Sequence, residues 1–122
     1  MNYSPSDLAD RFTIVKLKVA RQGKAFIKEY KALKSEVDAL ISSKVLDKKD
    51  LSRLYQINSK IWDLEARISS DSPRDTNYKK IAKLALQVRK WNTERTRVKA
   101  QIVAKTKKGF SDSKKFYFSG KK

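Results

Sequence analysis

The sequence predicts an all-α protein: an antiparallel three-helix bundle with two long helices and one shorter helix, plus a basic-aromatic C-terminal tail. Two observations lead to this fold class. The 122 residues include only three glycines and two prolines, and long stretches contain neither, which favours helices over turn-rich β structure. Apolar residues also recur at steps of three and four along three separate stretches, and this spacing lines one face of an α-helix.

The first predicted helix covers residues 5–43. Ser4 can accept hydrogen bonds from the free N–H groups of the first turn, Pro5 suits that turn, and Asp7 favours the positive end of the helix dipole. The apolar seam that follows consists of Leu8, Phe12, Val15, Val19, Phe26, Tyr30, Leu33, Val37 and Leu40. Gly23 marks a bend in this helix.

The second and third helices have start signals of the same kind. Asp47-Lys48-Lys49-Asp50 begins a helix over residues 47–69, with the seam Leu51, Leu54, Ile57, Ile61, Leu64 and Ile68. Ser72-Pro73-Arg74-Asp75 begins the third, with the seam Ile81, Leu84, Val88, Trp91, Arg95, Val98 and Ile102. Gly109 is predicted to stop it. This divides the chain into a helical bundle domain, 1–109, and an irregular tail, 110–122.

The lengths of the helices and connections predict how the chain assembles. Short connections make neighbouring helices antiparallel. The second helix is shorter than the other two, so part of the seam between the first and third lacks a partner within one chain. We therefore expect a homo-oligomer, in which a second copy covers that seam.

Composition excludes several function classes. The chain has no cysteine and no histidine, which removes disulfides, zinc-thiolate sites, thiol nucleophiles and the commonest general base. It has no glycine-rich phosphate loop, and its acidic residues are scattered. We therefore expect no enzyme activity, no cofactor and no metal. No apolar run approaches the roughly 18 residues of a membrane span, and residues 1–5 resemble no secretory signal, so we expect a cytoplasmic protein without a membrane partner.

The net charge of +17 is unevenly distributed along the chain. Residues 1–72 carry 14 basic and 10 acidic side chains, whereas residues 73–122 carry 16 basic and three acidic ones. Blocks of like charge are typical of nucleic-acid contact. The alternative is a lysine-rich, solvated surface with no ligand.

The third helix concentrates this charge, with eleven Lys and Arg and one acidic residue, Glu94, between positions 79 and 108. Acidic residues in this part of the chain are too few for i,i+4 pairs to neutralise Lys79, Lys80, Lys83, Arg89, Lys90, Arg97, Lys99, Lys105, Lys107 and Lys108. Phosphate would supply the missing negative charge. The alternative is a solvated face partly screened by acidic residues of the second helix, such as Asp63 and Glu65. In the tail, Lys114 and Lys115 precede three aromatic residues, which suits either base stacking or packing on a neighbouring subunit.

Polar residues on the apolar seams form a second group of candidates. One interpretation is structural: Arg95 pairs with Glu65 or Asp63, and Asn58 sets the register of the helices. The other is a pocket for a phosphate-bearing small ligand, lined by Arg11, Asn58, Trp62, Trp91, Asn92 and Arg95. The two tryptophans are more often core residues than stacking platforms, because they bury so much area.

Three stretches carry a resemblance to known proteins: residues 10–14 (Asp-Arg-Phe-Thr-Ile), 57–65 (Ile-Asn-Ser-Lys-Ile-Trp-Asp-Leu-Glu) and 92–95 (Asn-Thr-Glu-Arg). They resemble a loose group of small, largely uncharacterised all-helical proteins of tailed phages and bacteria. The resemblance implies an all-helical fold, the host cytosol as location if the chain is phage-encoded, and no particular activity. It draws attention to Arg11, Asn58, Asp63, Glu65, Asn92 and Arg95.

Three functions are compatible with these patterns. The first is non-catalytic binding of a phosphate-rich anion, above all nucleic acid, through the third helix and the tail. The second is an oligomeric phage-type sponge that sequesters a nucleotide or a cyclic oligonucleotide defence signal. The third is a protein–protein module that inhibits a host protein with an acidic surface, where charge steers the association.

Overall fold

The computed structural model describes residues 3–70 and 78–121, with side chains described as far as Lys107. The elements are α1 (Pro5–Gln22), a 3-10 turn η1 (Lys24–Phe26), α2 (Ile27–Ser42), α3 (Lys48–Ser70) and α4 (Tyr78–Lys121). Within the described residues there is no strand, so the all-α prediction is confirmed.

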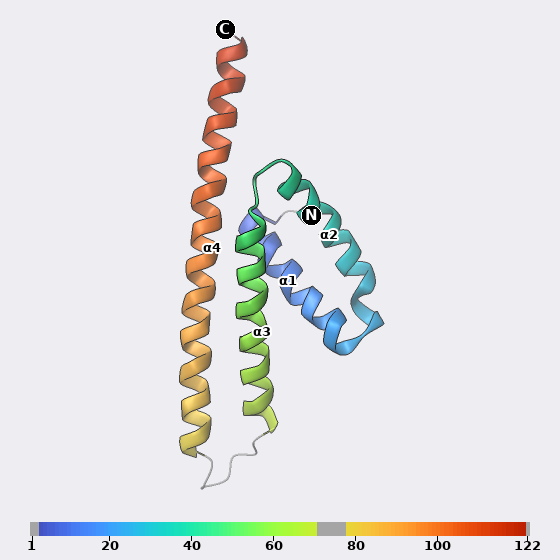
Figure 1. The fold of residues 1–122 in the computed structure, drawn as a ribbon, viewed down its shortest axis with the longest axis vertical. Coiled ribbons are helices and arrows are strands. Elements are labelled where there is room, and N and C mark those ends of the chain that lie inside the picture. The colour runs from blue at the N-terminus through green and yellow to red at the C-terminus, as the bar shows by residue number, and fades with distance from the viewer. Residues whose placement is uncertain (1–2, 71–77, 122) are drawn as a thin grey trace.

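The helices form two hairpins that pack together (Figure 1). α3 and α4 lie side by side and run in opposite directions, and α4 continues well beyond the start of α3. α1 crosses α3 at an angle and also contacts α4, while α2 folds back along α1 on the side remote from α4. α3 therefore lies between α4 and the turn that joins α1 to α2.

The prediction of one continuous helix over 5–43 is wrong, and the described residues form four α-helices rather than three. The chain reverses at Gly23, whose φ of 87° and ψ of −153° suit glycine and few other residues. After the turn, Tyr30 stacks on Phe12 of α1 with the two ring centroids 5.5 Å apart. The bend was expected at this residue. The sequence does not predict how sharp the bend is, because the same apolar spacing fits both one straight helix and two helices folded back on each other.

The predicted starts of the first two helices are confirmed. The Ser4 hydroxyl accepts a hydrogen bond from the Asp7 backbone N–H at 3.3 Å, and Pro5 occupies the first turn of α1. An Asp47 carboxylate oxygen accepts from the Lys49 N–H at 2.8 Å at the start of α3. The predicted start of the third helix at Ser72 lies outside the described residues.

The predicted helix stop at Gly109 and the irregular tail are both wrong, because α4 is helical as far as Lys121. A glycine inside a helix costs only about 1 kcal/mol relative to alanine. No proline follows residue 73, and helix-forming residues flank Gly109, so this cost is not enough to end the helix.

The core lies where α1, α3 and α4 meet, with contributions from α2. Its fully buried residues include Val15 of α1, Leu33 of α2, Leu54 and Ile57 of α3 and Ile102 of α4. Trp91 is partly buried against this cluster and so belongs to the core. Among the described residues, no helix combines the length and the apolar character that crossing a membrane would require.

Candidate functional site

The cations of α4 that face the rest of the protein are neutralised by acidic residues of the same chain. The Lys99 ammonium lies 3.0 Å from a carboxylate oxygen of Asp7 in α1. The Lys105 ammonium lies 2.9 Å from a carboxylate oxygen of Asp50, at the start of α3, and 3.6 Å from one of Asp47. The prediction that Lys99 and Lys105 need an external partner is therefore wrong, because those acids reach them across the helix interfaces.

Arg95 is the third of these inward cations, and its partner is Asp10. The guanidinium donates two hydrogen bonds to the Asp10 carboxylate, from Nε at 2.9 Å and from Nη2 at 2.5 Å. Asp10 is only 5% exposed. Paired hydrogen bonds between a guanidinium and a carboxylate are short, strong and directional. The contact thus fastens α4 to α1 in one orientation.

Asn58 connects α3 to the same carboxylate. Its side-chain amide donates to Oδ1 of Asp10 at 3.0 Å and to the Thr13 hydroxyl at 2.8 Å. The Thr13 hydroxyl in turn donates to the backbone carbonyl of Asp10 at 2.8 Å. Polar groups from three helices therefore satisfy one another inside the interface. We call Asp10, Thr13, Asn58 and Arg95 the polar network.

The pKa of Asp10 reflects this environment. Burial raises that pKa, but the hydrogen bonds from Arg95 and Asn58, together with the positive charges of Arg95 and Lys99, bring it below its ordinary value. The hydrogen bond to Asp10 in turn raises the pKa of Arg95. The pair is therefore ionised throughout the physiological pH range.

The structure assigns the partner of Arg95 differently from the sequence prediction, which named Glu65 or Asp63. Asp63 instead pairs with Arg21 of α1, whose guanidinium also donates to the Ser59 hydroxyl at 2.9 Å. Glu65 acts on Arg95 only through its charge. Asp10 escaped the sequence analysis because it lies 85 residues from Arg95, and helical spacing does not show which helices face each other.

A pocket of about 350 Å³ lies beside the polar network. It brings together four of the six predicted pocket residues, and its lining consists of Ile14, Leu17, Asn58, Ile61, Trp62, Glu65, Asn92 and Arg95. Arg11 lies elsewhere, because its guanidinium binds Glu29 of α2 at 3.0 Å and 2.5 Å. Trp91 packs on the core instead. The prediction that Arg11 and Trp91 join this pocket is therefore wrong.

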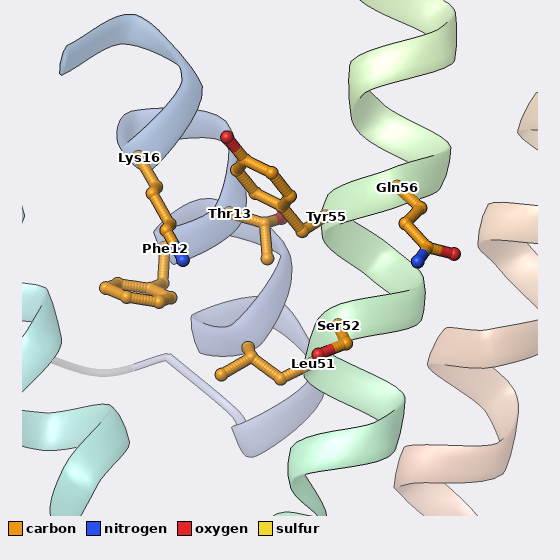
Figure 2. Close-up of a pocket in the computed structure, with 7 residues that line it drawn as sticks. All are labelled: Phe12, Thr13, Lys16, Leu51, Ser52, Tyr55 and Gln56. Carbon is orange, nitrogen blue, oxygen red and sulfur yellow. The ribbon is translucent and has the colours of Figure 1, made fainter. Parts of the chain in front are cut away.

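A second, smaller pocket of about 160 Å³ lies between α1 and α3 and shares no lining residue with the first (Figure 2). Lys16 from α1 and Tyr55 from α3 meet there, with the Lys16 ammonium 4.8 Å from the centre of the Tyr55 ring. A cation over an aromatic face is attracted by the ring's electrons. This contact holds Lys16 against the protein, and the pocket is too small for a nucleotide.

A second group of α4 cations is exposed to solvent. Lys79, Lys83, Lys90 and Arg97 are exposed and are spaced by four, seven and seven residues. This spacing places them along one line of the helix, about a third of a turn around from the buried seam of Leu84, Val98 and Ile102. We call these four residues the outward stripe.

Few acidic groups reach the outward stripe. Arg97 pairs with Glu94 at 2.6 Å within α4, so the prediction that Arg97 lacks a partner in its own helix is wrong; the contact is i,i+3. No ion pair forms at Lys79, Lys83 or Lys90 with any residue of the described chain. The acidic residues of α1 and the start of α3 are instead engaged with the inward cations.

The remaining candidate cations of α4 fall into three groups. Arg89 and Lys107 are exposed and make no ion pair within the described residues. Lys80 is exposed and has an interaction partner. The side chains of Lys108, Lys114 and Lys115 lie outside the described part of the structure, although the α4 backbone continues through these positions.

Comparison of the chain with protein-family models, with curated proteins and with solved structures finds no match. Within residues 3–70 and 78–121, no group of three or more acidic side chains is arranged to hold a metal ion. The geometry and charge of α4 and of the pocket therefore carry the functional argument.

Proposed function

We propose that this protein binds the phosphate backbone of nucleic acid, without catalysis, through the outward stripe of α4. One observation supports the proposal above the others: acidic residues of the chain neutralise the inward cations of α4, whereas Lys79, Lys83 and Lys90 make no ion pair with any described residue. Three cations along one helix repel one another, and an anionic partner offsets this repulsion. A polyphosphate chain supplies negative charge at regular intervals along a line.

The dimensions of the outward stripe suit such a partner. From Lys79 to Arg97 it spans about 27 Å at 1.5 Å per residue. This length corresponds to roughly eight base pairs of duplex. Contacts of this kind go to phosphate, so they position the protein and carry little sequence information. We therefore expect two duplexes of unrelated sequence to bind with similar affinity.

A salt series tests the proposal directly. We expect the logarithm of the association constant for a short fluorescent duplex to fall linearly with the logarithm of salt concentration. The slope should lie near −0.9 per neutralised phosphate, hence about −3 to −4 for the four residues of the outward stripe. Fluorescence anisotropy measures the affinity. A flat salt response, or no binding at low salt, would contradict nucleic-acid binding.

The pocket beside the polar network supports a second candidate, the sequestration of a nucleotide or cyclic oligonucleotide signal. The amides of Asn58 and Asn92 and the ring of Trp62 are groups that can hydrogen-bond and stack on a base. Asp10 already occupies the phosphate-binding fork of Arg95, which weakens the case for a phosphate there. This candidate therefore ranks below the outward stripe.

Material released on denaturing the purified protein separates these candidates. A sponge releases an intact nucleotide, detected by mass spectrometry, and nuclease treatment before denaturation leaves it in place. A backbone-binding protein releases heterogeneous nucleic acid, which nuclease removes. A protein that persists with the chain in nuclease-treated lysate would instead favour the third function, a module that docks on an acidic host protein.

A further inference from the structure

The turn between α1 and α2 carries a second concentration of positive charge. Residues 16–31 include six basic side chains and one acidic one, Glu29. The Glu29 carboxylate accepts two hydrogen bonds from Arg11, so it is engaged outside this group. The near-balance of charge over residues 1–72 conceals this local excess, because most of the acidic residues of that stretch lie elsewhere.

Three of the six cations are attached to the protein surface. The Lys16 ammonium lies over the Tyr55 ring (Figure 2), and that of Lys18 lies 5.0 Å from the centre of the Phe26 ring. Arg21 pairs with Asp63 and donates to Ser59. These contacts explain how half of the charge is accommodated within one molecule.

The other three cations are Lys24, Lys28 and Lys31, which we call the turn surface. All three are exposed, and within the described residues none forms an ion pair, a hydrogen bond or a cation–aromatic contact. Lys28 and Lys31 lie one turn apart on α2, and Lys24 lies in the 3-10 turn just before it. The reversal of the chain at Gly23 places these lysines at the outer end of the α1–α2 hairpin.

The turn surface and α4 lie on opposite flanks of the protein. In Figure 1, α4 lies along one flank, α3 comes next, and the turn between α1 and α2 projects on the other flank. The outward stripe lies to one side of α4, where Arg97 and Arg53 of α3 both pair with the Glu94 carboxylate, at 2.6 Å and 3.8 Å. A short duplex bound parallel to α4 therefore runs along one flank, and the turn that carries Lys24, Lys28 and Lys31 lies across α3 from it.

We infer that Lys24, Lys28 and Lys31 form a second phosphate-binding surface, through which one protein molecule bridges two nucleic-acid segments. The inference rests on the proposed function, because it assigns the same ligand chemistry to both flanks. Each surface presents three lysines that make no ion pair within the described residues, and each suits a phosphate backbone for the same reason.

A bridging assay tests this inference. One duplex of about one helical turn is attached to beads, a second carries a fluorophore, and the protein is added to both; this length keeps one duplex from reaching both surfaces. The test variant is Lys24→Gln/Lys28→Gln/Lys31→Gln. The matched control is Lys48→Gln/Lys49→Gln/Lys60→Gln, which removes the same charge from exposed lysines of α3 that have no ion pair within the described residues.

We expect the wild type and the control variant to capture the fluorescent duplex on the beads. The turn-surface variant should bind a single duplex within about twofold of the control but lose bridging by about tenfold or more, since its outward stripe is intact. Sedimentation of the free proteins should show the same association state for all three, and thermal melts the same stability.

The outcomes distinguish the two proposals. A wild type that binds no duplex overturns both. A wild type that binds one duplex but captures no second one overturns the bridging inference and leaves the proposed function standing. Bridging that is unchanged in the turn-surface variant, or lost together with a changed association state, also overturns the inference, because the two duplexes are then joined through self-association.

Discussion

Replacing Lys79, Lys83 and Lys90 with glutamine is expected to lower the affinity for a short duplex by about 100-fold at a salt concentration near 0.1 M. Each lysine that contacts a phosphate releases about 0.9 counterion equivalents, so the salt slope should also fall by about 2.7. These three side chains are exposed and unpaired within the described residues, so the thermal melt should barely change. Anisotropy across a salt series measures both quantities.

The control for this variant is again Lys48→Gln/Lys49→Gln/Lys60→Gln, which has the same net charge. If affinity depends on the outward stripe, the control should lose only a few-fold, through the weaker overall field. Equal losses in both triple variants would show that binding follows net charge alone. The assignment of the interface to α4 would then be wrong.

The α4 cations fall into two groups, those that pair with α1 or α3 and those of the outward stripe. They show what can and cannot be predicted from the sequence. The sequence shows that acidic residues are scarce within the third helix, and within the described residues Lys79, Lys83 and Lys90 make no ion pair. That these three lysines bind an anion stays a prediction. Lys99 and Lys105 look identical to them in sequence, yet Asp7 and Asp50 neutralise them. Deciding between the two groups requires knowing which face of α4 meets α1 and α3, and this depends on tertiary packing.

Two glycines show that the course of the helices, too, is only partly predictable from local sequence. Gly23 and Gly109 both interrupt long helical patterns, but the chain reverses at the first and α4 continues through the second. Local sequence offers little to separate them, since one glycine costs a helix only about 1 kcal/mol. The contact between Phe12 and Tyr30, 18 residues apart, accompanies the reversal at Gly23. The helix starts, by contrast, follow from Ser4 and Asp47 because capping is a local interaction.

Arg95 is where the structural and ligand-binding interpretations of the sequence diverge most, and Arg95→Leu tests them. In this variant the Asp10 carboxylate, with 7% of its side chain exposed, loses its paired hydrogen bonds to the guanidinium. Removing one partner of a buried pair costs about 3–5 kcal/mol, and the partial exposure of Arg95 places this case near the lower end. We expect the melting temperature to fall by on the order of 10 °C.

Arg97→Leu is the matched control, because Arg97 lies two residues further along α4 and its side chain is 65% exposed. Its ion pair with Glu94 lies at the surface, where such pairs contribute about 0–1 kcal/mol. We therefore expect a melting temperature within a few degrees of the wild type. A similar loss in both variants would indicate that leucine on α4, rather than the polar network, causes the effect.

The pH dependence identifies Asp10 as the source of the loss. In the wild type the pKa of Asp10 lies below its ordinary value, so the stability from its ionised form is present above about pH 3.9 and disappears as the pH falls through the lowered pKa. In Arg95→Leu, burial raises this pKa without the opposing guanidinium, so a proton binds the folded variant at higher pH. The gap in melting temperature between wild type and Arg95→Leu should therefore be widest near neutral pH and narrow toward about pH 3.9. A variant as stable as the wild type at neutral pH that has lost binding of a small ligand would instead place Arg95 in a ligand site, with Asp10 as its support.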